Sequence, residues 1–489
     1  MEQMKLKNSY AKMVAMIGII TLMPIVIIPF YPQDAKYLWS FLLPGGGSLI
    51  LAYILNYLVE EKHSNHWKTI LNHNNQLVLF SWFYGFLLGA LPFVISGFLP
   101  FIGAFFEAVS GFTTTGLSVM QVDKTPHIFL FHRSFMQFVG GVGFVLMMTM
   151  FVQEKNSSNL YSVEGHPDIL TPNIKGTARL IMKMYVFYLI LGVLGYMLFG
   201  MNLFESVCHS MCSLSTGGFS TRLGSIGEYN NPMIEIVTAF LMIIGTTNFA
   251  TLLLFAKGRF KQAFNVSEMK FMFVVMAISL PLVVTNLCMQ LNMDLFTAIR
   301  CYLVDGISAI STTGYSSMSY QNWPQFSVAV LTVLMIIGGG AGSTAGGMKL
   351  SRVYLAIKMA YYNFKSRLFS ARTVECPEFI KAQGKEEITP ALMHDNNSFL
   401  TLYLLIFVFG SLALTLSANC SIGEAMFEFA SALSTVGLSI GITGPTTNNL
   451  TLIIEIIGMI LGRLEIYAVF IGTFATFNNI KAHFRKRCS

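Results

Sequence analysis

The hexapeptide Thr113-Thr114-Thr115-Gly116-Leu117-Ser118 returns in varied form three more times along a chain of 489 residues. The later copies are Ser215-Thr216-Gly217-Gly218-Phe219-Ser220, Ser311-Thr312-Thr313-Gly314-Tyr315-Ser316 and Ser434-Thr435-Val436-Gly437-Leu438-Ser439. Every copy opens with a hydroxyl residue and has Thr second, Gly fourth and Ser sixth. The four glycines are 102, 96 and 123 residues apart, and this spacing indicates four copies of a whole structural unit rather than a short solenoid repeat.

The composition is that of a membrane protein. The chain is 54% apolar and only 11% charged, with a mean hydropathy of +0.61, whereas soluble domains carry roughly 25% charged residues. Apolar stretches of about 20 residues recur along the chain, and each is long enough to cross ~30 Å of hydrocarbon. The first of them, Val14 to Phe30, is followed by no small-residue cleavage site, so we expect a retained span rather than a signal peptide.

Each hexapeptide follows a short apolar segment and lies between two longer ones. The short segments, at 101–112, 203–214, 295–310 and 422–433, cannot cross a bilayer, and a re-entrant segment is tolerated only against protein or a water-filled cavity. We therefore predict an all-α polytopic membrane protein with ten spans and four re-entrant loops. Four pseudo-fourfold span–pore-loop–span repeats surround one pore, and an N-terminal two-helix hairpin precedes them. The expected units are 1–75 (hairpin and link), 76–175, 176–265, 266–395 and 396–489 (repeats one to four).

Basic residues give the expected orientation. With ten spans, 25 of the 31 lysines and arginines fall on the side of both termini, and four on the other side. The remaining two, Arg133 and Arg463, fall inside spans. The excess marks the cytoplasmic side, so we expect both termini in the cytoplasm and all four hexapeptides opening outward. The net charge of +7 is accounted for by this bias and by contact with anionic membrane lipid, without nucleic acid.

The hexapeptides have the composition of an ion filter. Rings of backbone carbonyls can replace the hydration shell of an ion, and small hydroxyl residues and glycine leave carbonyls uncovered. The alternative is close packing between membrane helices, but four copies in one register, each after a short helix, favour a filter. The predicted ion-binding residues are Thr114, Thr115, Gly116, Thr216, Gly217, Gly218, Thr312, Thr313, Gly314, Thr435, Val436 and Gly437.

Nine residues before each glycine of this filter lie Glu107, His209, Asp305 and Glu428. Ionisable groups at membrane depth are costly and are usually paired or functional. We expect them to support the short helices against the filter, the alternative being that they add negative potential. The histidine could titrate, but a neutral, hydrogen-bonded ring is the preferred interpretation.

A second informative stretch is the predicted gate. Gly338, Gly339, Gly340, Gly342, Gly346 and Gly347 fall within ten residues of an apolar span. Since glycine costs about 1 kcal/mol per residue in a helix relative to alanine, the span should break into two pieces joined by irregular backbone. A dinucleotide-binding fingerprint is excluded, because it needs a strand in a soluble βαβ unit.

Arg463 is the other predicted gate residue, in the last span. An arginine at that depth is expensive unless it faces the pore or a partner, and a fixed cation below the filter would repel permeating cations. Glu455 and Glu465 are candidate partners, and a purely structural ion pair is the alternative.

Four such units, the gate loop and Gly462-Arg463-Leu464-Glu465 together resemble the TrkH/TrkG/KtrB superfamily of potassium uptake proteins, and the leading hairpin resembles its TrkH branch. The resemblance implies a homodimer whose subunits each have a pore, and a cytoplasmic ring of TrkA-like nucleotide-binding regulatory subunits. It also places Arg463 against the gate loop. Relatives that pass sodium well often have Ser at the first filter glycine, so four glycines favour potassium.

The expected function is potassium uptake across a bacterial-type plasma membrane through a gated filter, with K⁺ as the permeant ion and no organic cofactor. Potassium symport with protons or sodium is the open alternative. An enzyme is not expected, because the nine histidines are dispersed and no nucleophile or metal motif is present. Cys208 and Cys212 lie one helical turn apart, and we expect them to pack rather than bind metal.

Overall fold

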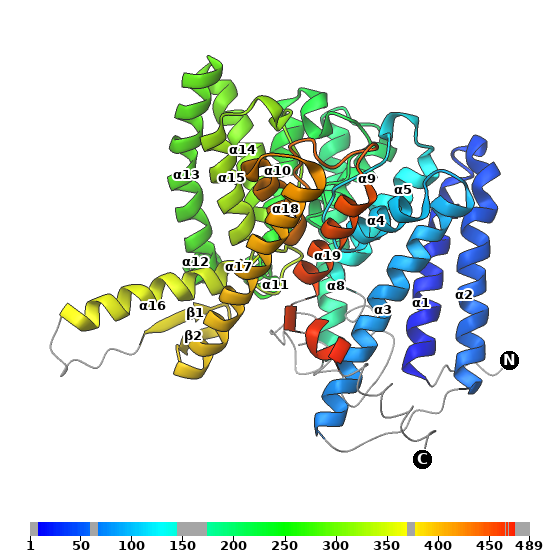
Figure 1. Ribbon diagram of the computed structural model, residues 1–489, viewed down its shortest axis with the longest axis horizontal. Helices are drawn as coiled ribbons and strands as arrows, with labels where there is room; N and C mark the ends of the chain where they lie inside the picture. Colours follow the sequence, from blue (N-terminus) through cyan, green and yellow to red (C-terminus); the bar gives the residue numbers. More distant parts are fainter. Residues whose placement is uncertain are drawn as a thin grey trace.

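The computed structural model describes residues 8–58, 67–143, 174–368, 377–464, 466–467 and 469–474. Almost all regular structure in these ranges is helical (Figure 1). Six of the described helices are long and apolar enough to cross a membrane, or seven if the bent pair α10 (Pro232–Thr246) and α11 (Phe249–Ala256) counts as one span. The predicted all-α, polytopic fold class is confirmed.

The N-terminal hairpin consists of α1 (Ser9–Leu22) and α2 (Leu38–Leu58), which pack together at one edge of the molecule (Figure 1). A 3₁₀ turn over Pro32–Tyr37 leads into α2. The hairpin is tied to the first repeat by Asp34, whose carboxylate accepts a hydrogen bond from the backbone N–H of Ile128 at 2.9 Å. The hairpin is therefore an addition to the side of the repeats rather than part of their ring.

Each repeat begins with a long helix and continues with a short one. The long helices carry exposed apolar side chains along much of their length, as expected for lipid contact. They are α3 (Trp67–Ile95), α8 (Ile174–Leu198), α13 (Ser267–Leu291) and α17 (Pro390–Ala418). The short helices are α4 (Phe101–Phe112), α9 (Leu203–Leu214), α14 (Leu295–Ser311) and α18 (Ile422–Leu433).

Local sequence explains where the short helices begin. Asn202, Asp294 and Ser421 each accept a hydrogen bond from the backbone N–H three residues ahead, and Ser421 forms a capping box with Glu424. Pro100 precedes the first short helix, whose start carries no side-chain cap. Three of the four predicted segments match these helices, and the third helix is longer than expected, with 17 residues.

A third helix in each repeat packs beside the short helix. It lies in the second of the two longer apolar segments and is called the second helix below. These helices are α5 (His127–Val142), α10, α15 (Gln325–Ile337) and α19 (Asn449–Arg463). The bend between α10 and α11 is 114° and falls at Thr247 and Asn248, so the span of repeat two is interrupted there.

The glycine-rich stretch of the third repeat is irregular over a longer range than the six glycines alone. Helix α15 ends at Ile337, residues 338–349 are irregular, and the next helix begins at Leu350. Gly338, Gly342 and Gly347 have φ of 71°, 67° and 76°, a region that favours glycine, so this backbone cannot return to a helix before residue 350.

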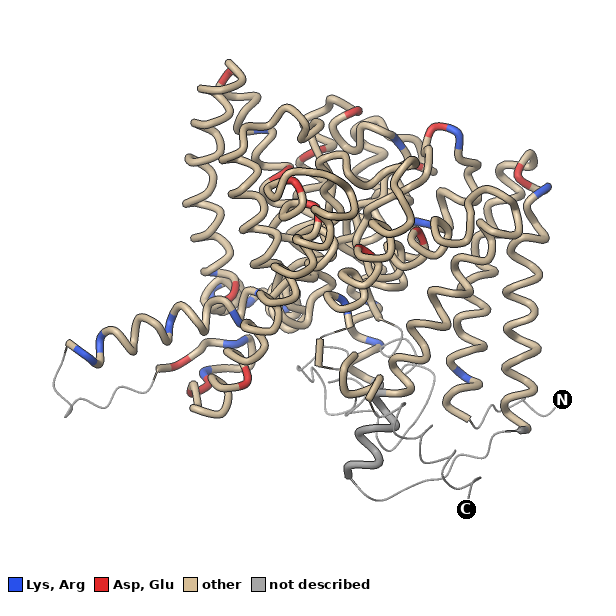
Figure 2. Tube along the Cα trace, in the orientation of Figure 1, with Lys and Arg blue, Asp and Glu red and all other residues tan. Residues whose placement is uncertain are grey.

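After this loop the chain enters α16 (Leu350–Leu368), which projects sideways from the bundle (Figure 1). It contains two lysines and two arginines, and the trace of this helix is blue at several points in Figure 2. A two-stranded antiparallel hairpin, β1 (Glu378–Lys381) and β2 (Gly384–Glu387), follows and leads into α17. The short helix α12 (Phe260–Asn265) connects α11 to α13.

Glycines allow the second helices to approach the ends of the short helices. A Cβ atom on Gly140 would lie 1.9 Å from the carbonyl oxygen of Phe112, and one on Gly462 would lie 1.8 Å from that of Leu433. The corresponding distance from Gly245 to the Leu214 oxygen is 2.5 Å. In three repeats, therefore, the second helix can reach the end of the short helix only through glycine.

We expect Gly140→Ala to destabilise the protein, because the added methyl group overlaps backbone that cannot move aside, and overpacking costs roughly 1–3 kcal/mol. Thermal unfolding in detergent measures the effect. Gly47→Ala, on α2 with no atom within 4 Å of the added carbon, is the matched control and should unfold at or above the parent temperature. Equal effects of the two substitutions would contradict the packing role of Gly140.

Candidate functional site

The four hexapeptides, hereafter the glycine segments (residues 113–118, 215–220, 311–316 and 434–439), share one backbone conformation. Their second-position threonines are left-handed, with φ between 53° and 57°, and their glycines have φ between 73° and 100°. The backbone N–H of the residue that precedes each glycine donates to the carbonyl oxygen of the residue five positions before it in the chain, at 2.8–2.9 Å. Each segment is therefore fixed to the end of its own short helix.

The glycine segments close into a ring. A Cβ atom on any of the four glycines would lie 2.0–2.2 Å from a carbonyl oxygen of the next segment. The pairs are Gly116 with Gly217 O, Gly218 with Thr313 O, Gly314 with Val436 O, and Gly437 with Thr115 O. The order one–two–three–four–one means that the structure brings all twelve predicted ion-binding residues into one ring, whose backbones touch so closely that only glycine fits.

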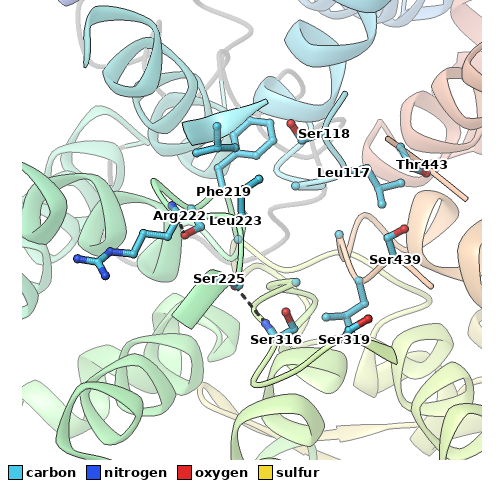
Figure 3. A pocket seen from close by; sticks show the side chains of 18 of the residues that line it. Leu117, Ser118, Phe219, Arg222, Leu223, Ser225, Ser316, Ser319, Ser439 and Thr443 are labelled. Carbon is cyan, nitrogen blue, oxygen red and sulfur yellow. Dashed lines mark hydrogen bonds between the residues drawn. The ribbon is translucent and has the colours of Figure 1, made fainter. Parts of the chain in front are cut away.

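A cavity of about 590 Å³ lies against this ring. All four glycines line it, with the serines that follow them and the loops beyond (Figure 3). In Figure 3 the labelled side chains of the four segments surround one opening, and the N–H of Ser316 donates to Ser225 at 3.3 Å across two repeats. The ring therefore has an open approach on one side.

The four residues nine positions before the glycines hold the outer ends of the segments. All four are buried, and each hydrogen-bonds to a serine that follows its glycine. The contacts are Ser118 to Glu107 at 3.0 Å, Ser220 with His209 at 3.2 Å, Ser317 to Asp305, and Ser439 to Glu428 at 2.6 Å. In repeat three the serine is one residue later than in the others.

These contacts correspond to the supporting role expected from the sequence. Backbone N–H groups add to them: Val119 donates to Glu107 at 3.2 Å, and Ile440 donates to Glu428 at 2.9 Å. The other nitrogen of the His209 ring contacts the carbonyl of Glu205 at 2.9 Å. A carboxylate that accepts several such bonds holds the loop beyond the glycine segment in one position.

Arg133 on α5 is a contributor that sequence reasoning counted only as a charge inside a span. Its Nε lies 2.6 Å from Glu107, its Nη2 donates to Ser118 at 2.8 Å, and its guanidinium lies 4.0 Å from the centre of the Phe219 ring. It thus links segment one to segment two. Charge and depth marked this residue in the sequence, but nothing there paired it with a residue of another repeat.

Glu455, a predicted partner of Arg463, has a different neighbour. Its carboxylate accepts a hydrogen bond from the hydroxyl of Thr443 at 2.8 Å, and Thr443 also contacts Glu428 at 2.5 Å. Glu455 therefore belongs to the support of segment four. Glu465, the other predicted partner, lies outside the described residues.

The glycine-rich loop (residues 338–349) lies directly against the ring. The N–H of Gly346 donates to the hydroxyl of Thr312 at 2.7 Å, and the hydroxyl of Thr344 lies 3.1 Å from that of Thr216. A Cβ on Gly346 would be 2.1 Å from the hydroxyl of Thr435. The loop thus contacts the second-position threonines of repeats two, three and four.

The interrupted span of repeat two holds the other side of this loop. Gly340 N–H donates to the carbonyl of Thr246 at 3.0 Å, and the side chain of Asn248 donates to the carbonyl of Ala341 at 2.5 Å. Glu268 accepts from the N–H of Ala341 at 3.2 Å. The loop is therefore held by hydrogen bonds between the ring on one side and the bend of the repeat-two span on the other.

Arg463 joins the loop to repeat one. Its guanidinium donates to the carbonyl of Thr344 at 2.6 Å and to those of Gly140 and Gly141 at 2.6 and 3.2 Å. The expected meeting of Arg463 with the glycine-rich loop is thus present in the structure. One side chain bridges backbone from repeats one and three.

The described residues contain no group of three or more His, Cys, Asp or Glu side chains that could hold a metal ion. Cys208 and Cys212 are free and buried, as packing residues would be. The chemistry that the site offers is accordingly that of oxygen atoms arranged around a ring.

Four re-entrant segments inside a bundle of apolar helices define a polytopic membrane protein built from pore-loop repeats. A family model described as TrkH, cation transport protein, matches residues 50–479. The chain therefore belongs to the TrkH family of cation transport proteins, as its sequence resemblance implied.

Relatives and a solved structure agree with this assignment. The chain is 28% identical over 473 residues to an uncharacterised cation transporter of Methanocaldococcus jannaschii, covering 95% of this chain and 93% of the relative. It is 29% identical over 409 residues to the Trk system potassium uptake protein TrkG of Escherichia coli, covering 81% and 83%. The crystal structure of the potassium transporter TrkH from Vibrio parahaemolyticus superposes with a TM-score of 0.82 and 25% identity, covering 94% of this chain and 96% of that one.

We expect Glu107→Ala to reduce the yield of folded protein severely. It leaves the buried Arg133 without its carboxylate, and breaking a buried ion pair on one side costs about 3–5 kcal/mol. Melting temperature and monodispersity in detergent measure the loss. The control is Glu424→Ala on α18, an exposed helix-capping carboxylate, for which we expect a loss of about 1 kcal/mol. A Glu107 variant as stable as the Glu424 variant would show that the ion pair is dispensable.

Proposed function

We propose that this protein takes up potassium ions across the plasma membrane through a gated selectivity filter formed by the four glycine segments. The observation that carries the proposal is the closed ring of segments, in which each glycine packs against a carbonyl oxygen of the next repeat. Potassium is supported by the printed names of TrkG from Escherichia coli and TrkH from Vibrio parahaemolyticus. Uptake would be driven by the membrane potential, at about 2.3 kcal/mol per charge per 100 mV.

The ion ligands in this proposal are backbone carbonyls of the twelve predicted filter residues. Such oxygens replace hydration water around a dehydrated cation and bind it weakly enough for release. Glycine at the fourth position of every segment keeps the ring narrow, and this supports preference for potassium. The ring is only pseudo-fourfold, because the residue before the glycine is Thr, Gly, Thr or Val in the four repeats.

The gate in this proposal is the glycine-rich loop together with Arg463. The loop lies against the threonines at one end of the ring, and the arginine ties it to repeat one through three carbonyl contacts. A guanidinium at that position also repels cations, since like charges a few ångströms apart interact strongly where water is scarce. Opening would require these hydrogen bonds to break.

The proposed setting follows the family. The protein would lie in the bacterial inner membrane with both termini in the cytoplasm, as a homodimer with one pore per subunit. TrkA-like nucleotide-binding subunits would contact its cytoplasmic surface, of which the basic helix α16 is a part. The position of α16 supports a regulatory contact there, because this helix begins directly after the glycine-rich loop that forms the proposed gate.

Uptake of potassium or rubidium by cells that lack their own potassium uptake systems tests the function. Cells producing the parent chain, with a TrkA-like subunit co-expressed, should accumulate potassium in strong preference to sodium. Gly116→Ser should lower the potassium-to-sodium ratio about tenfold, or about 1.4 kcal/mol of discrimination, because the new side chain displaces the Gly217 carbonyl. An unchanged ratio would remove segment one from the filter, and no uptake by the parent would refute the function.

We expect Arg463→Ala to raise basal flux several-fold in proteoliposomes, because the loop loses its attachment to repeat one and the repelling charge is gone. Arg463→Lys, which keeps the charge but cannot contact three carbonyls in the same geometry, should fall between parent and alanine variant. Arg259→Ala, at an exposed cytoplasmic arginine, is the control and should match the parent. Flux at or below the parent in Arg463→Ala would mean that the arginine is not part of a gate.

A further inference from the structure

Gln137 on α5 is fully buried and makes two hydrogen bonds to the backbone of segment two. Its amide nitrogen donates to the carbonyl oxygen of Gly217 at 2.5 Å, and its amide oxygen accepts from the N–H of Phe219 at 3.0 Å. The donor and acceptor of the backbone fix the orientation of the side-chain amide. One side chain from repeat one thus holds the segment of repeat two on both sides of its glycine.

Segment two is the one that needs such support. The residue before the glycine is Gly217, whereas the other segments have Thr115, Thr313 or Val436 there. A Cβ atom on Gly217 would lie only 2.4 Å from the Cδ of Gln137, so the amide group occupies the space in which the other segments carry a side chain. Glycine and glutamine are therefore complementary at this point.

The other repeats have methionine where repeat one has glutamine. Gln137 precedes by three residues the glycine that packs against the end of the short helix, and the same step back from Gly245 and Gly462 leads to Met242 and Met459. In α15, which ends before Gly338, the step leads to Met335. All three methionines are fully buried.

Each methionine belongs to the apolar cluster that includes the next segment in the ring. Met242 clusters with Tyr315, Met335 with Val436, and Met459 with Leu117. At these three boundaries the position therefore belongs to the same apolar core as the next segment. Only between repeats one and two is the pairing polar, and only there does the segment have glycine before its filter glycine.

Gly217 contributes to the ring at the same level as its three counterparts. Its carbonyl oxygen would lie 2.2 Å from a Cβ on Gly116, as the corresponding oxygens of Thr115, Thr313 and Val436 would from theirs. A peptide between two glycines has the greatest freedom to rotate. Without a partner for both its carbonyl and the following N–H, this peptide would be the least constrained ligand of the ring.

We propose that Gln137 is a selectivity-determining positioning residue, which holds the Gly217 carbonyl in the ring of filter ligands. This inference rests on the proposed function and identifies the residue pair on which its cation preference depends. Gln137 acts through the backbone of segment two and need not touch the ion. Its loss should affect the ratio of ions transported rather than only the amount of protein that folds.

The experiment replaces the two residues with the pair found at two other boundaries of the ring, methionine from repeats two and four and threonine from repeats three and one. Gln137→Met should lower the potassium-to-sodium uptake ratio at least tenfold and raise the KM for potassium. Gly217→Thr alone should also lower the potassium-to-sodium uptake ratio, because the threonine side chain overlaps the side chain of Gln137. The double variant Gln137→Met with Gly217→Thr recreates the Thr-and-Met pairing of the boundaries between repeats two and three and between repeats four and one, and should return the ratio to within threefold of the parent. Gln290→Met, at an exposed glutamine on α13, is the control and should match the parent.

The ratio is measured on whatever protein reaches the membrane, so it does not depend on expression. A parent-like ratio in Gln137→Met would overturn the inference and leave the proposed function standing. If the Gln137→Met variant transports no ion, a double variant that transports ions and prefers potassium supports the inference. A double variant that also transports no ion overturns it. A parent that transports no monovalent cation refutes the function itself, before any variant is compared.

Discussion

The structure depends on the contact between the glycine at the fourth position of each glycine segment and a carbonyl oxygen of the neighbouring repeat. Four chain segments meet so closely that a single carbon atom on any of the glycines would overlap backbone of the next. Two residues before each glycine a threonine adopts a left-handed conformation, which costs a non-glycine residue of order 1–3 kcal/mol and persists only where its surroundings impose it. The short helices impose it here, because they end in hydrogen bonds that hold the segments in place. The repeats are thus mutually dependent rather than independent units.

Around this nearly symmetrical ring the support is not symmetrical. Three repeats use carboxylates to hold the outer serine and one uses a histidine. Arg133 and Gln137 lie four residues apart on α5, so they share one face of that helix, and both reach segment two. The boundary between repeats one and two is therefore polar, where the corresponding methionines make the other boundaries apolar.

Much of this architecture could be predicted from the sequence, since the repeated hexapeptide marks each segment of the ring and the apolar stretches before it mark the short helices. The broken helix at Thr247 and Asn248 and the contact of Arg463 with the glycine-rich loop also correspond to local signals, namely helix-breaking residues and a charge at membrane depth. The full extent of the loop, to residue 349, depends on contacts with Gly245, Thr246 and Thr312 that form only in the folded bundle.

The roles of Arg133 and Gln137 were missed for a related reason. Gln137 and its partner Gly217 are 80 residues apart, and no spacing rule connects residues of different repeats. A comparison of the four repeats in register would have shown glutamine against three methionines. It would not have shown which backbone atoms the amide meets.

The position of α16 has a mechanical consequence. The helix starts where the glycine-rich loop ends, and its first N–H donates to the carbonyl of Gly339 at 2.8 Å. Nineteen residues at a rise of 1.5 Å make a rod about 28 Å long. A displacement of the far end of this helix would therefore be transmitted to the glycine-rich loop as a smaller displacement beside the ring.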